Sequence, residues 1–392
     1  MSGAGIAQRR LEAQRLVGEP LPTAADAVRR LVAVQSQDYA GAKWALAQRT
    51  TGVTDAELDR QFDAGAFLRL HAVRPTWHFV AQEDLRWLLA LTGPRVHQAS
   101  AYQYRQLEID RPLARRAADV YERVLAGGLA MTKDELGVHL NAAGIPADGL
   151  RLLYLILHAE AEAIVCSGPR RNGKHTHALV EERAAPAPAR TREEALAELA
   201  GRYVAGHGPA QDIDLAWWSG LTLADARRGL ATASPALEQE TIDGRTFWSS
   251  DDDGGVCQAG RSATRATTVN LLPNYDELLV AFRDRREGLD PALPPPARIA
   301  DEILSHGIVR DGLLVGRWWR TVENGVVTLR LDRRIPLTSV EESLLGAAVE
   351  RYAAFLGRPA TVAPVLSSAS PSGRFGLADS PGRDSSVGRA RD

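Results

Sequence analysis

The chain has 392 residues, of which 45% are hydrophobic and 24% are charged, values ordinary for a folded globular protein. At roughly 100 to 200 residues per domain, this length favours two or three packed units. The formal net charge of −2 argues against binding of polyanions over the whole surface. It does not exclude a local basic channel, because a sum of charges does not say where they lie.

The sequence lacks features that mark several other classes of protein. No run of about 18 apolar residues is present, and the polar start lacks the basic and apolar regions of a signal peptide. We therefore expect a cytoplasmic protein that does not contact membranes. The two cysteines, Cys166 and Cys257, give neither a disulfide framework nor a zinc site by themselves. No glycine-rich phosphate loop is present, so we expect no nucleotide cofactor and no cofactor of another kind.

Residues 1–108 alternate helical patterns and end in a predicted β-hairpin. Thr23 and Thr54 each precede an acidic residue by three positions, a spacing typical of helix N-termini. Alternating β-favouring residues on both sides of Arg74-Pro75 indicate two strands. Helices followed by a two-stranded wing are typical of a winged helix, a variant of the helix-turn-helix. Two expected helices span 6–17 and 42–48, and two others begin at Thr23 and Thr54. The expected strands span 68–73 and 76–80.

The same order returns twice along the chain. Residues 109–185 show three helical patterns and then two strands around the turn at 168–174. Residues 186–268 repeat this order and close with a hairpin signal at Asp243-Gly244. Three copies of one supersecondary order predict a tandem array of winged-helix units.

Residues 269–364 follow a different pattern. They contain a predicted small sheet over 307–332, with a hairpin turn at 323–325, and a closing amphipathic helix over 339–356. Residues 365–392 carry few large apolar side chains, and we expect them to be disordered. The predicted fold is therefore α+β and mainly α, with three winged-helix units and a C-terminal sheet and helix region.

Gln35-Ser36-Gln37 interrupts an apolar helical pattern. With a 3.6-residue period, Gln35 continues the inward face formed by Ala24, Ala27, Val28 and Leu31. Gln37 would point away from Gln35 if the helix continued, because two residues rotate the side chain by about 200°. The two amides converge only if the helix ends near Gln35 and the next residues are extended. Two interpretations remain. Either an inward glutamine is structural and bonds to nearby backbone, or the two glutamines form a polar pair at the floor of a cleft.

Basic side chains cluster at two places. The wing of the second unit carries three fixed positive charges and two histidines: Arg170, Arg171, Lys174, His175 and His177. A basic hairpin beside a recognition-type helix suits phosphate contacts, although a solvated turn has the same composition. Arg261 and Arg265, surrounded by Ser and Thr, form a second candidate phosphate-binding segment.

Two further groups have structural and functional interpretations. His71, Arg74 and His78 share the first predicted hairpin. Histidines on a wing are usually structural or exposed; direct catalysis and a DNA-facing or supporting role are the alternatives. No third ligand follows the histidines at a recognisable spacing, so we expect no metal site. Asp276 and Arg283 fall on one predicted helical face, where we expect a partly buried ion-pair network that fixes the C-terminal region to the rest.

Three segments resemble a known family when they are taken together. They are Val34-Gln-Ser-Gln-Asp-Tyr, Arg74-Pro-Thr-Trp-His-Phe-Val, and Leu272-Pro-Asn-Tyr-Asp-Glu-Leu-Leu-Val with Arg283-Asp-Arg. In this order they resemble the AlkZ-like winged-helix DNA glycosylases, over roughly residues 6 to 364. The resemblance implies tandem winged helices in a C-shape around a DNA channel and removal of alkylated bases, with unhooking of crosslinks by some members.

The resemblance also implies site residues. The family signature is Gln, any residue, Gln, with Asp in the second position in another branch. Gln35 and Gln37 match the first form, whereas Asp38 lies one residue too late for the second. A guanine alkylated at N7 or an adenine alkylated at N3 is cationic and already leaves readily, so no strong general acid is needed. A glutamine can accept a hydrogen bond from the attacking water and orient it.

The resulting hypothesis assigns water positioning to Gln35 and Gln37, with support from Asp38, Arg74 and His78. The expected partner is double-stranded DNA with alkylated bases, and we expect a monomer. A non-enzymatic winged-helix DNA-binding protein, such as a transcriptional regulator, is the alternative. A protein-interaction scaffold built from winged helices is a third interpretation, consistent with the net charge of −2.

Overall fold

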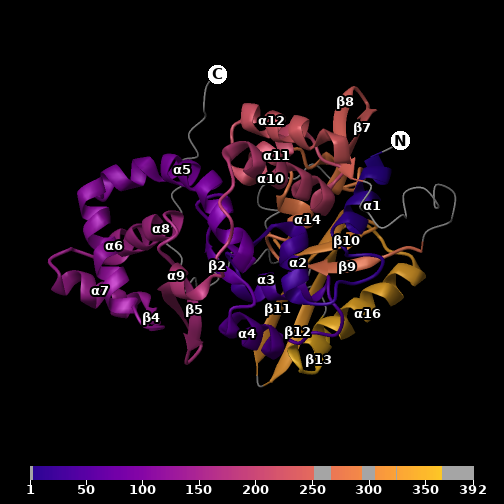
Figure 1. Cartoon of the computed structure of the whole chain (residues 1–392). Coiled ribbons are helices and arrows are strands. Elements are labelled where there is room, and N and C mark those ends of the chain that lie inside the picture. Colours follow the sequence, from indigo (N-terminus) through magenta and orange to yellow (C-terminus); the bar gives the residue numbers. More distant parts are fainter. Residues whose placement is uncertain (1–2, 251–265, 294–304, 324, 364–392) are drawn as a thin grey trace.

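A computed structural model describes residues 3–250, 266–293, 305–323 and 325–363. These residues combine helices with four sheets, in agreement with the predicted α+β class. Residues 82–183 form a lobe at one side of the molecule, and the other elements lie together (Figure 1). Arg261, Arg265 and the predicted tail at 365–392 lie outside the described residues. No helix among the described residues is long and apolar enough to cross a membrane.

The first part of the chain contains the predicted helices and hairpin. The Thr23 hydroxyl accepts a hydrogen bond from the backbone N–H of Asp26 at 3.1 Å, so this helix begins with a capping box as predicted. The two strands of the hairpin pair antiparallel, with Leu70 opposite His78. The elements are α1 (Gly3–Ala13), α2 (Ala24–Leu31), β1 (Ala33–Gln35), α3 (Tyr39–Ala47), α4 (Asp55–Ala64), β2 (Leu68–His71) and β3 (Trp77–Val80).

The second helix ends four residues before Gln35, earlier than its apolar pattern indicates. Helix α2 ends at Leu31, and Val32 has a φ of 66°. A positive φ is rare for a β-branched residue, and it turns the chain out of the helix. The next three residues form β1, which pairs antiparallel with β3 and places Gln35 opposite His78. The chain is therefore extended at Gln35, which is the condition for the two glutamines to share one side.

The order of elements in the first part occurs twice more. Each part has a helix, a short extended segment, two helices and two strands. The extended segment always pairs with the last strand: β1 with β3, β4 with β6, and Ala210 with Trp248 as an isolated bridge. The second part contains α6 (Arg111–Leu125), β4 (Met131–Thr132), α7 (Lys133–Ala142), α8 (Gly149–Ala161), β5 (Val165–Arg171), β6 (Lys174–Leu179) and α9 (Val180–Arg183). The third contains α10 (Arg192–His207), α11 (Asp212–Ser219), α12 (Leu223–Ala233), η1 (Ser234–Ala236), β7 (Leu237–Ile242) and β8 (Arg245–Ser250).

A long helix, α5 (Gln82–Gln106), leads from β3 into the second part and packs against α8. The two helices approach closely at Gly93. A Cβ atom at this position would lie 2.6 Å from the carbonyl oxygen of Ala161, closer than packing allows. A side chain at residue 93 would therefore push the two helices apart.

The C-terminal region forms a five-stranded sheet with a long helix. Its strand order is β13-β12-β11-β10-β9, and the predicted hairpin is present, with Glu323 opposite Val326. The indole Nε1–H of Trp44 donates to the carbonyl oxygen of Leu271 at 2.6 Å, and its ring packs on Tyr352. The first part and the C-terminal region therefore share a core. The elements are β9 (Val269–Leu272), α14 (Glu277–Val280), η2 (Arg286–Gly288), β10 (Gly307–Arg310), β11 (Leu313–Glu323), β12 (Val326–Arg333), α16 (Ser339–Leu356) and β13 (Ala360–Ala363).

Candidate active site

Gln35 is held from two sides at the end of β1. Its backbone N–H donates to Oε1 of Glu277 at 2.7 Å, and its side-chain oxygen lies 3.4 Å from an Nη atom of Arg74, which donates. Only 8% of Gln35 is exposed. The geometry therefore orients this amide, with its oxygen facing a guanidinium group.

Glu277 is a buried carboxylate that joins three segments far apart in the sequence. Its second oxygen accepts from the indole Nε1–H of Trp218 at 2.9 Å and lies 3.6 Å from Nε2 of His207. Glu277 thus connects the strand that carries Gln35 to helices α10 and α11 of the third part. Without this carboxylate, the backbone of Gln35 and the indole of Trp218 would both lose their hydrogen-bond partner.

The backbone after Gln35 is also fixed, whereas Gln37 is not. The N–H of Ser36 donates to the carbonyl oxygen of Trp77 at 2.8 Å, and the carbonyl oxygen of Ser36 accepts from Arg69. Burial lowers the pKa of Arg69 to about 10, so its guanidinium group stays charged at neutral pH. Gln37 is partly exposed, and its side chain makes no hydrogen bond to the described residues. Gln37 is therefore free to bind a ligand.

Asp38 has a local structural role. It is the N-cap of α3, and its Oδ1 accepts from the backbone N–H of Gly41 at 3.1 Å. An N-cap carboxylate satisfies amide groups that have no partner within the helix. Asp38 thus fixes where α3 begins, directly after Gln37.

The first part carries extra residues at this point. In the second part, Thr132 is both the last residue of β4 and the N-cap of α7. In the third part, Gln211 caps α11 directly after the bridging residue Ala210. Only in the first part do two residues, Ser36 and Gln37, lie between the extended segment and the cap. The glutamine pair therefore coincides with an insertion into the repeated pattern.

The structure separates the two histidines of the first hairpin. His78 lies directly opposite Gln35, so the two side chains share a face of the sheet. Its Nδ1–H donates to the carbonyl oxygen of Thr76 at 2.8 Å, and its buried Nε2 has no partner among the described residues. Burial, with the nearby charge of Arg74, lowers the pKa of His78 well below 6.5, so the ring is neutral. His71 instead contacts the buried carboxylate of Glu160.

Three arginines surround a half-exposed tryptophan next to this site. The guanidinium carbons of Arg74, Arg283 and Arg285 lie 5.6, 5.4 and 5.7 Å from the ring centroid of Trp217. None of the three forms a salt bridge with a described residue. Burial and the like charges of Arg74 and Arg283 lower the pKa of Arg285. The charge of Arg74 is partly balanced by Glu277, whereas Arg283 and Arg285 add positive charge that can attract an anion.

The predicted pair of Asp276 and Arg283 does not form. Helix α14 is only four residues long, so the two side chains do not share a helical face. Asp276 instead accepts two hydrogen bonds from Arg49, at 2.8 and 3.0 Å, with both side chains buried. The expected ion pair between the C-terminal region and the rest is present, with a different partner.

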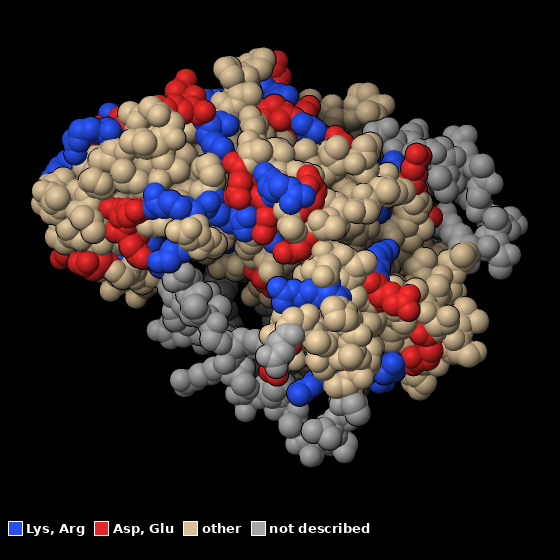
Figure 2. Space-filling view, turned by 90° about the horizontal axis from the view of Figure 1, so that it is seen from below, with Lys and Arg blue, Asp and Glu red and all other residues tan. Residues whose placement is uncertain are grey.

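The basic wing is largely neutralised by acids from other elements. Arg170 pairs with Asp59 and Asp63 at 2.9 Å each, and Arg171 contacts Glu135. Lys174 is exposed. On the face seen from below, basic and acidic side chains lie next to each other (Figure 2). Two of the three fixed charges expected to contact phosphate are thus already paired within the protein.

His175 is not on the outer surface of the wing. Its ring packs against Tyr39 and Phe62, with centroids 4.7 and 6.0 Å away. Burial, together with the charges of Arg69 and Arg170, lowers the pKa of His175 to about 3. In the native protein this histidine is therefore neutral over the whole physiological range.

This depressed pKa predicts a loss of stability in acid that His175→Phe removes. Below the ordinary value of 6.5, the unfolded chain binds a proton at His175 that the native protein binds only near pH 3. Between about pH 7.5 and about pH 5.5, the free energy of unfolding should fall in both proteins. In the wild type this fall should be larger than in the variant by about 1.4 kcal/mol. Urea unfolding at both pH values measures this difference, and His139→Gln, at an exposed histidine, is the control. Equal losses in His175→Phe and the wild type would show that His175 protonates normally in the native state.

Comparison with known proteins identifies the family. A family model described as DNA glycosylase AlkZ-like matches residues 28–355. The chain belongs to the AlkZ-like DNA glycosylase family. An interstrand DNA cross-link repair glycosylase from Streptomyces sahachiroi is 24% identical over 356 residues, which cover 85% of this chain and 92% of that protein. The solved structure of the DNA glycosylase AlkZ from the same organism aligns with a TM-score of 0.73 at 19% identity, over 93% of this chain and 100% of that chain.

Membership of the AlkZ-like family confirms the resemblance drawn from the three sequence segments. The matched range includes Gln35, Gln37, Glu277 and the arginines around Trp217. It also favours an enzyme over a regulator or a scaffold. The structural match shows that this AlkZ-like chain shares the fold of AlkZ.

The sequence did not reveal the roles of Glu277 and Trp217. The available signal was a pair of adjacent tryptophans at the end of a short helix. Successive residues of a helix point about 100° apart, so both rings are not expected to be buried equally. One of them, Trp218, is fully buried, and the other, Trp217, is 38% exposed. Nothing in the local sequence indicates which residues surround them.

Proposed function

We propose that this chain hydrolyses the N-glycosidic bond between deoxyribose and an alkylated, cationic purine in double-stranded DNA. The observation that carries this proposal is the asymmetry of the glutamine pair. Gln35 is held by Glu277 and Arg74, whereas Gln37 is partly exposed and has no hydrogen-bond partner among the described residues. One fixed amide beside one free amide suits the positioning of a water molecule.

In the proposed reaction, the chain supplies position rather than a strong acid. The cationic base departs as a neutral purine with the electrons of the glycosidic bond. Water adds to the deoxyribose carbon from the opposite face, and the proton that it loses passes to solvent. The carbonyl oxygen of Gln37 accepts a hydrogen bond from this water, and Gln35 orients it from the other side. The buried Nε2 of His78 is a further acceptor on the face of Gln35. Positioning of this kind can supply several kcal/mol of the barrier without a shifted carboxyl pKa.

We further propose that residues 1–108, 109–185 and 186–268 are three winged-helix units, followed by the C-terminal region over 269–364. The repeated order of elements supports this division, as does the pairing of each extended segment with the last strand of its part. A C-shaped arrangement around a DNA channel would place Gln35 and Gln37 near the duplex. The protein would act as a monomer, with no cofactor.

The substrate is proposed to be a bulky or crosslinked lesion as well as a methylated base. A pocket of about 160 Å³ lies beside Arg74; Arg95 and Gly220 also line it, whereas Gln35 and Gln37 do not. Pockets that enclose small ligands usually measure about 300–1,000 Å³. An open site without a deep base pocket would tolerate large adducts, and crosslink repair is the activity named for the relative from Streptomyces sahachiroi.

The cluster around Trp217 is the proposed contact to the DNA backbone. Each phosphate contact contributes about 0.9 to the slope of log affinity against log salt for duplex DNA. Arg283→Gln and Arg285→Gln should each weaken duplex binding and reduce this slope by about that amount. Fluorescence anisotropy at several salt concentrations measures the slope. Arg115→Gln, at an exposed arginine paired with Asp119, should leave it unchanged, and an unchanged slope in both cluster variants would exclude these contacts.

A base-release assay tests the proposed activity. Purified protein is incubated with duplexes that carry N7-methylguanine or a bulky N7 adduct, and the released base is measured by chromatography. We expect release of the modified base and an abasic strand, with none from undamaged duplex. Intact substrate with both lesions would contradict the proposal.

A further inference from the structure

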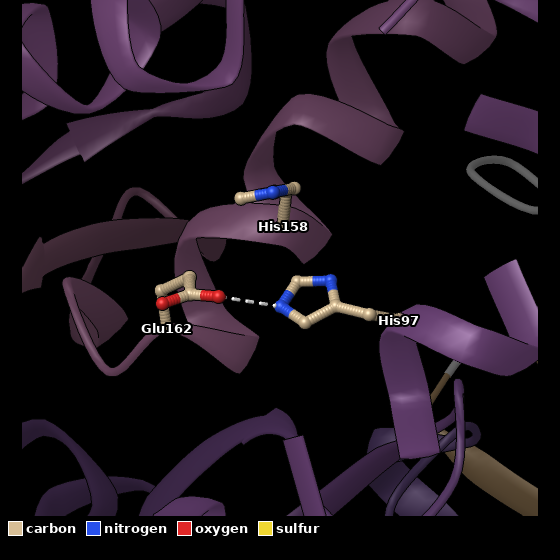
Figure 3. Close-up of side chains that lie close together, drawn as sticks. All are labelled: His97, His158 and Glu162. Carbon is tan, nitrogen blue, oxygen red and sulfur yellow. Dashed lines mark hydrogen bonds and ion pairs between the residues drawn. The ribbon is translucent and has the colours of Figure 1, made fainter. Parts of the chain in front are cut away.

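Two histidines and a glutamate meet where α5 packs on α8, outside the site described above (Figure 3). His97 comes from α5, His158 from α8, and Glu162 directly follows α8. One ligand atom from each lies within 4.8 Å of the other two. We propose that these three side chains bind one zinc ion, a site independent of the proposed glycosylase activity.

The positions of the three side chains suit a single ion. His97 Nε2 lies 2.9 Å from Oε1 of Glu162, and the rings of His97 and His158 are 4.5 Å apart. His158 and Glu162 are four residues apart, a spacing that places both on the same side of a helix. Zinc binds imidazole nitrogen and carboxylate oxygen at about 2.0–2.2 Å, so its ligand atoms lie about 3.3 Å apart in a tetrahedral shell. To bind zinc, the three ligand atoms, which now lie within 4.8 Å of one another, must move to that spacing.

A second contact selects the nitrogen of His97 that faces the site. Nδ1 of His97 lies 3.0 Å from the hydroxyl oxygen of Tyr104, one of the aromatic side chains around both histidines. Without an ion, Nε2–H donates to the Glu162 carboxylate at 2.9 Å. With zinc bound, Nδ1–H would donate to the tyrosine oxygen, and the lone pair of Nε2 would bind the ion. Histidines that bind metals usually donate their other N–H to an oxygen in this way, which fixes the ring.

The backbone around the site is held by close packing. Gly93 lies one helical turn before His97, and Ala161 directly precedes Glu162. Their near contact presses α5 against α8 at this point. The glutamate side chain is 53% exposed and therefore free to turn toward an ion. A bound ion would join the two helices and stabilise their packing.

The donor set selects the type of ion. Two imidazoles and one carboxylate, with the fourth position open to water, are a common zinc-binding set. Magnesium and calcium prefer oxygen ligands alone and should bind much more weakly. The proposed ligand is therefore a divalent transition ion of the zinc class.

Isothermal titration of the full-length chain, without a histidine tag, tests this site. We expect ZnCl₂ to bind with one equivalent, MgCl₂ to give no binding, and the temperature of unfolding to rise with zinc. His97→Gln, His158→Gln and Glu162→Gln should each abolish or strongly weaken zinc binding, and the exposed glutamate variant should fold normally. Tyr104→Phe should weaken it about 10- to 100-fold. His139→Gln, at an exposed histidine of α7, should bind zinc as the wild type does.

The proposal is overturned if the wild type shows no zinc binding. It is also overturned if His158→Gln and Glu162→Gln bind zinc as tightly as the wild type, because binding would then occur elsewhere. Unchanged affinity in Tyr104→Phe would overturn the role given to the tyrosine hydroxyl. The result of the glycosylase assay does not affect the test of the zinc site.

Discussion

Gln37→Ala should lower the rate of base release from an N7-methylguanine duplex about 100-fold while leaving the fold intact. The variant removes the amide that we propose accepts a hydrogen bond from the attacking water. Because Gln37 is partly exposed and bonded to no described residue, the free energy of unfolding should change by less than about 0.5 kcal/mol. Single-turnover kinetics and urea unfolding measure the two quantities separately.

Matched variants make this result specific. Gln239→Ala removes an exposed glutamine on β7 and should cleave at the wild-type rate. Gln35→Ala/Gln37→Ala should lose less than the product of the two single losses, because groups that position one water act together. Affinity for undamaged duplex should stay constant throughout. Wild-type cleavage by Gln37→Ala would remove this residue from the mechanism.

The largest expected effect on stability is that of Asp276→Asn. Arg49 and Asp276 are buried, with side-chain exposures of 1% and 0%, and are joined by two hydrogen bonds. Loss of the carboxylate charge leaves the guanidinium group buried without an ionic partner. Breaking a buried pair from one side typically costs about 3–5 kcal/mol, and we expect the free energy of unfolding to fall by that amount. Urea or thermal unfolding measures it.

A double variant separates the ion pair from simple packing. Replacing both partners, as in Arg49→Met/Asp276→Leu, removes both buried charges and should recover part of the lost stability. Asp119→Asn, in the exposed pair with Arg115, should cost less than about 1 kcal/mol. If Asp276→Asn costs no more than Asp119→Asn, the buried pair does not hold the C-terminal region in place. Because Asp276 precedes Glu277, a destabilised pair should also slow base release.

Residues close together in the sequence were predicted well. The helices after Thr23 and Thr54 begin where predicted, because each hydroxyl accepts a hydrogen bond from the backbone N–H three residues later. The turn at Asp243-Gly244 has two positive φ angles, as the hairpin signal predicts. The end of α2 was missed because Val32 adopts a conformation that its residue type disfavours.

The charge of the basic wing shows a different limit of sequence analysis. Arg170 is 107 residues from Asp63, and no periodicity connects the two positions. Packing of β5 on α4 brings them together. A cluster of cations in the sequence is therefore not yet a cationic surface, because distant acids can neutralise it.

By itself, the sequence determined the repeated order of helices and hairpins, the Gln-x-Gln signature and the resemblance to the AlkZ-like family. These features depend on residues within a few positions of one another, where capping, turn geometry and side-chain period act. The tertiary structure decided the surroundings of Gln35. Its backbone partner, Glu277, is 242 residues away, and the arginines around Trp217 come from separate segments. Such contacts arise from the packing of whole units, for which local sequence carries no signal.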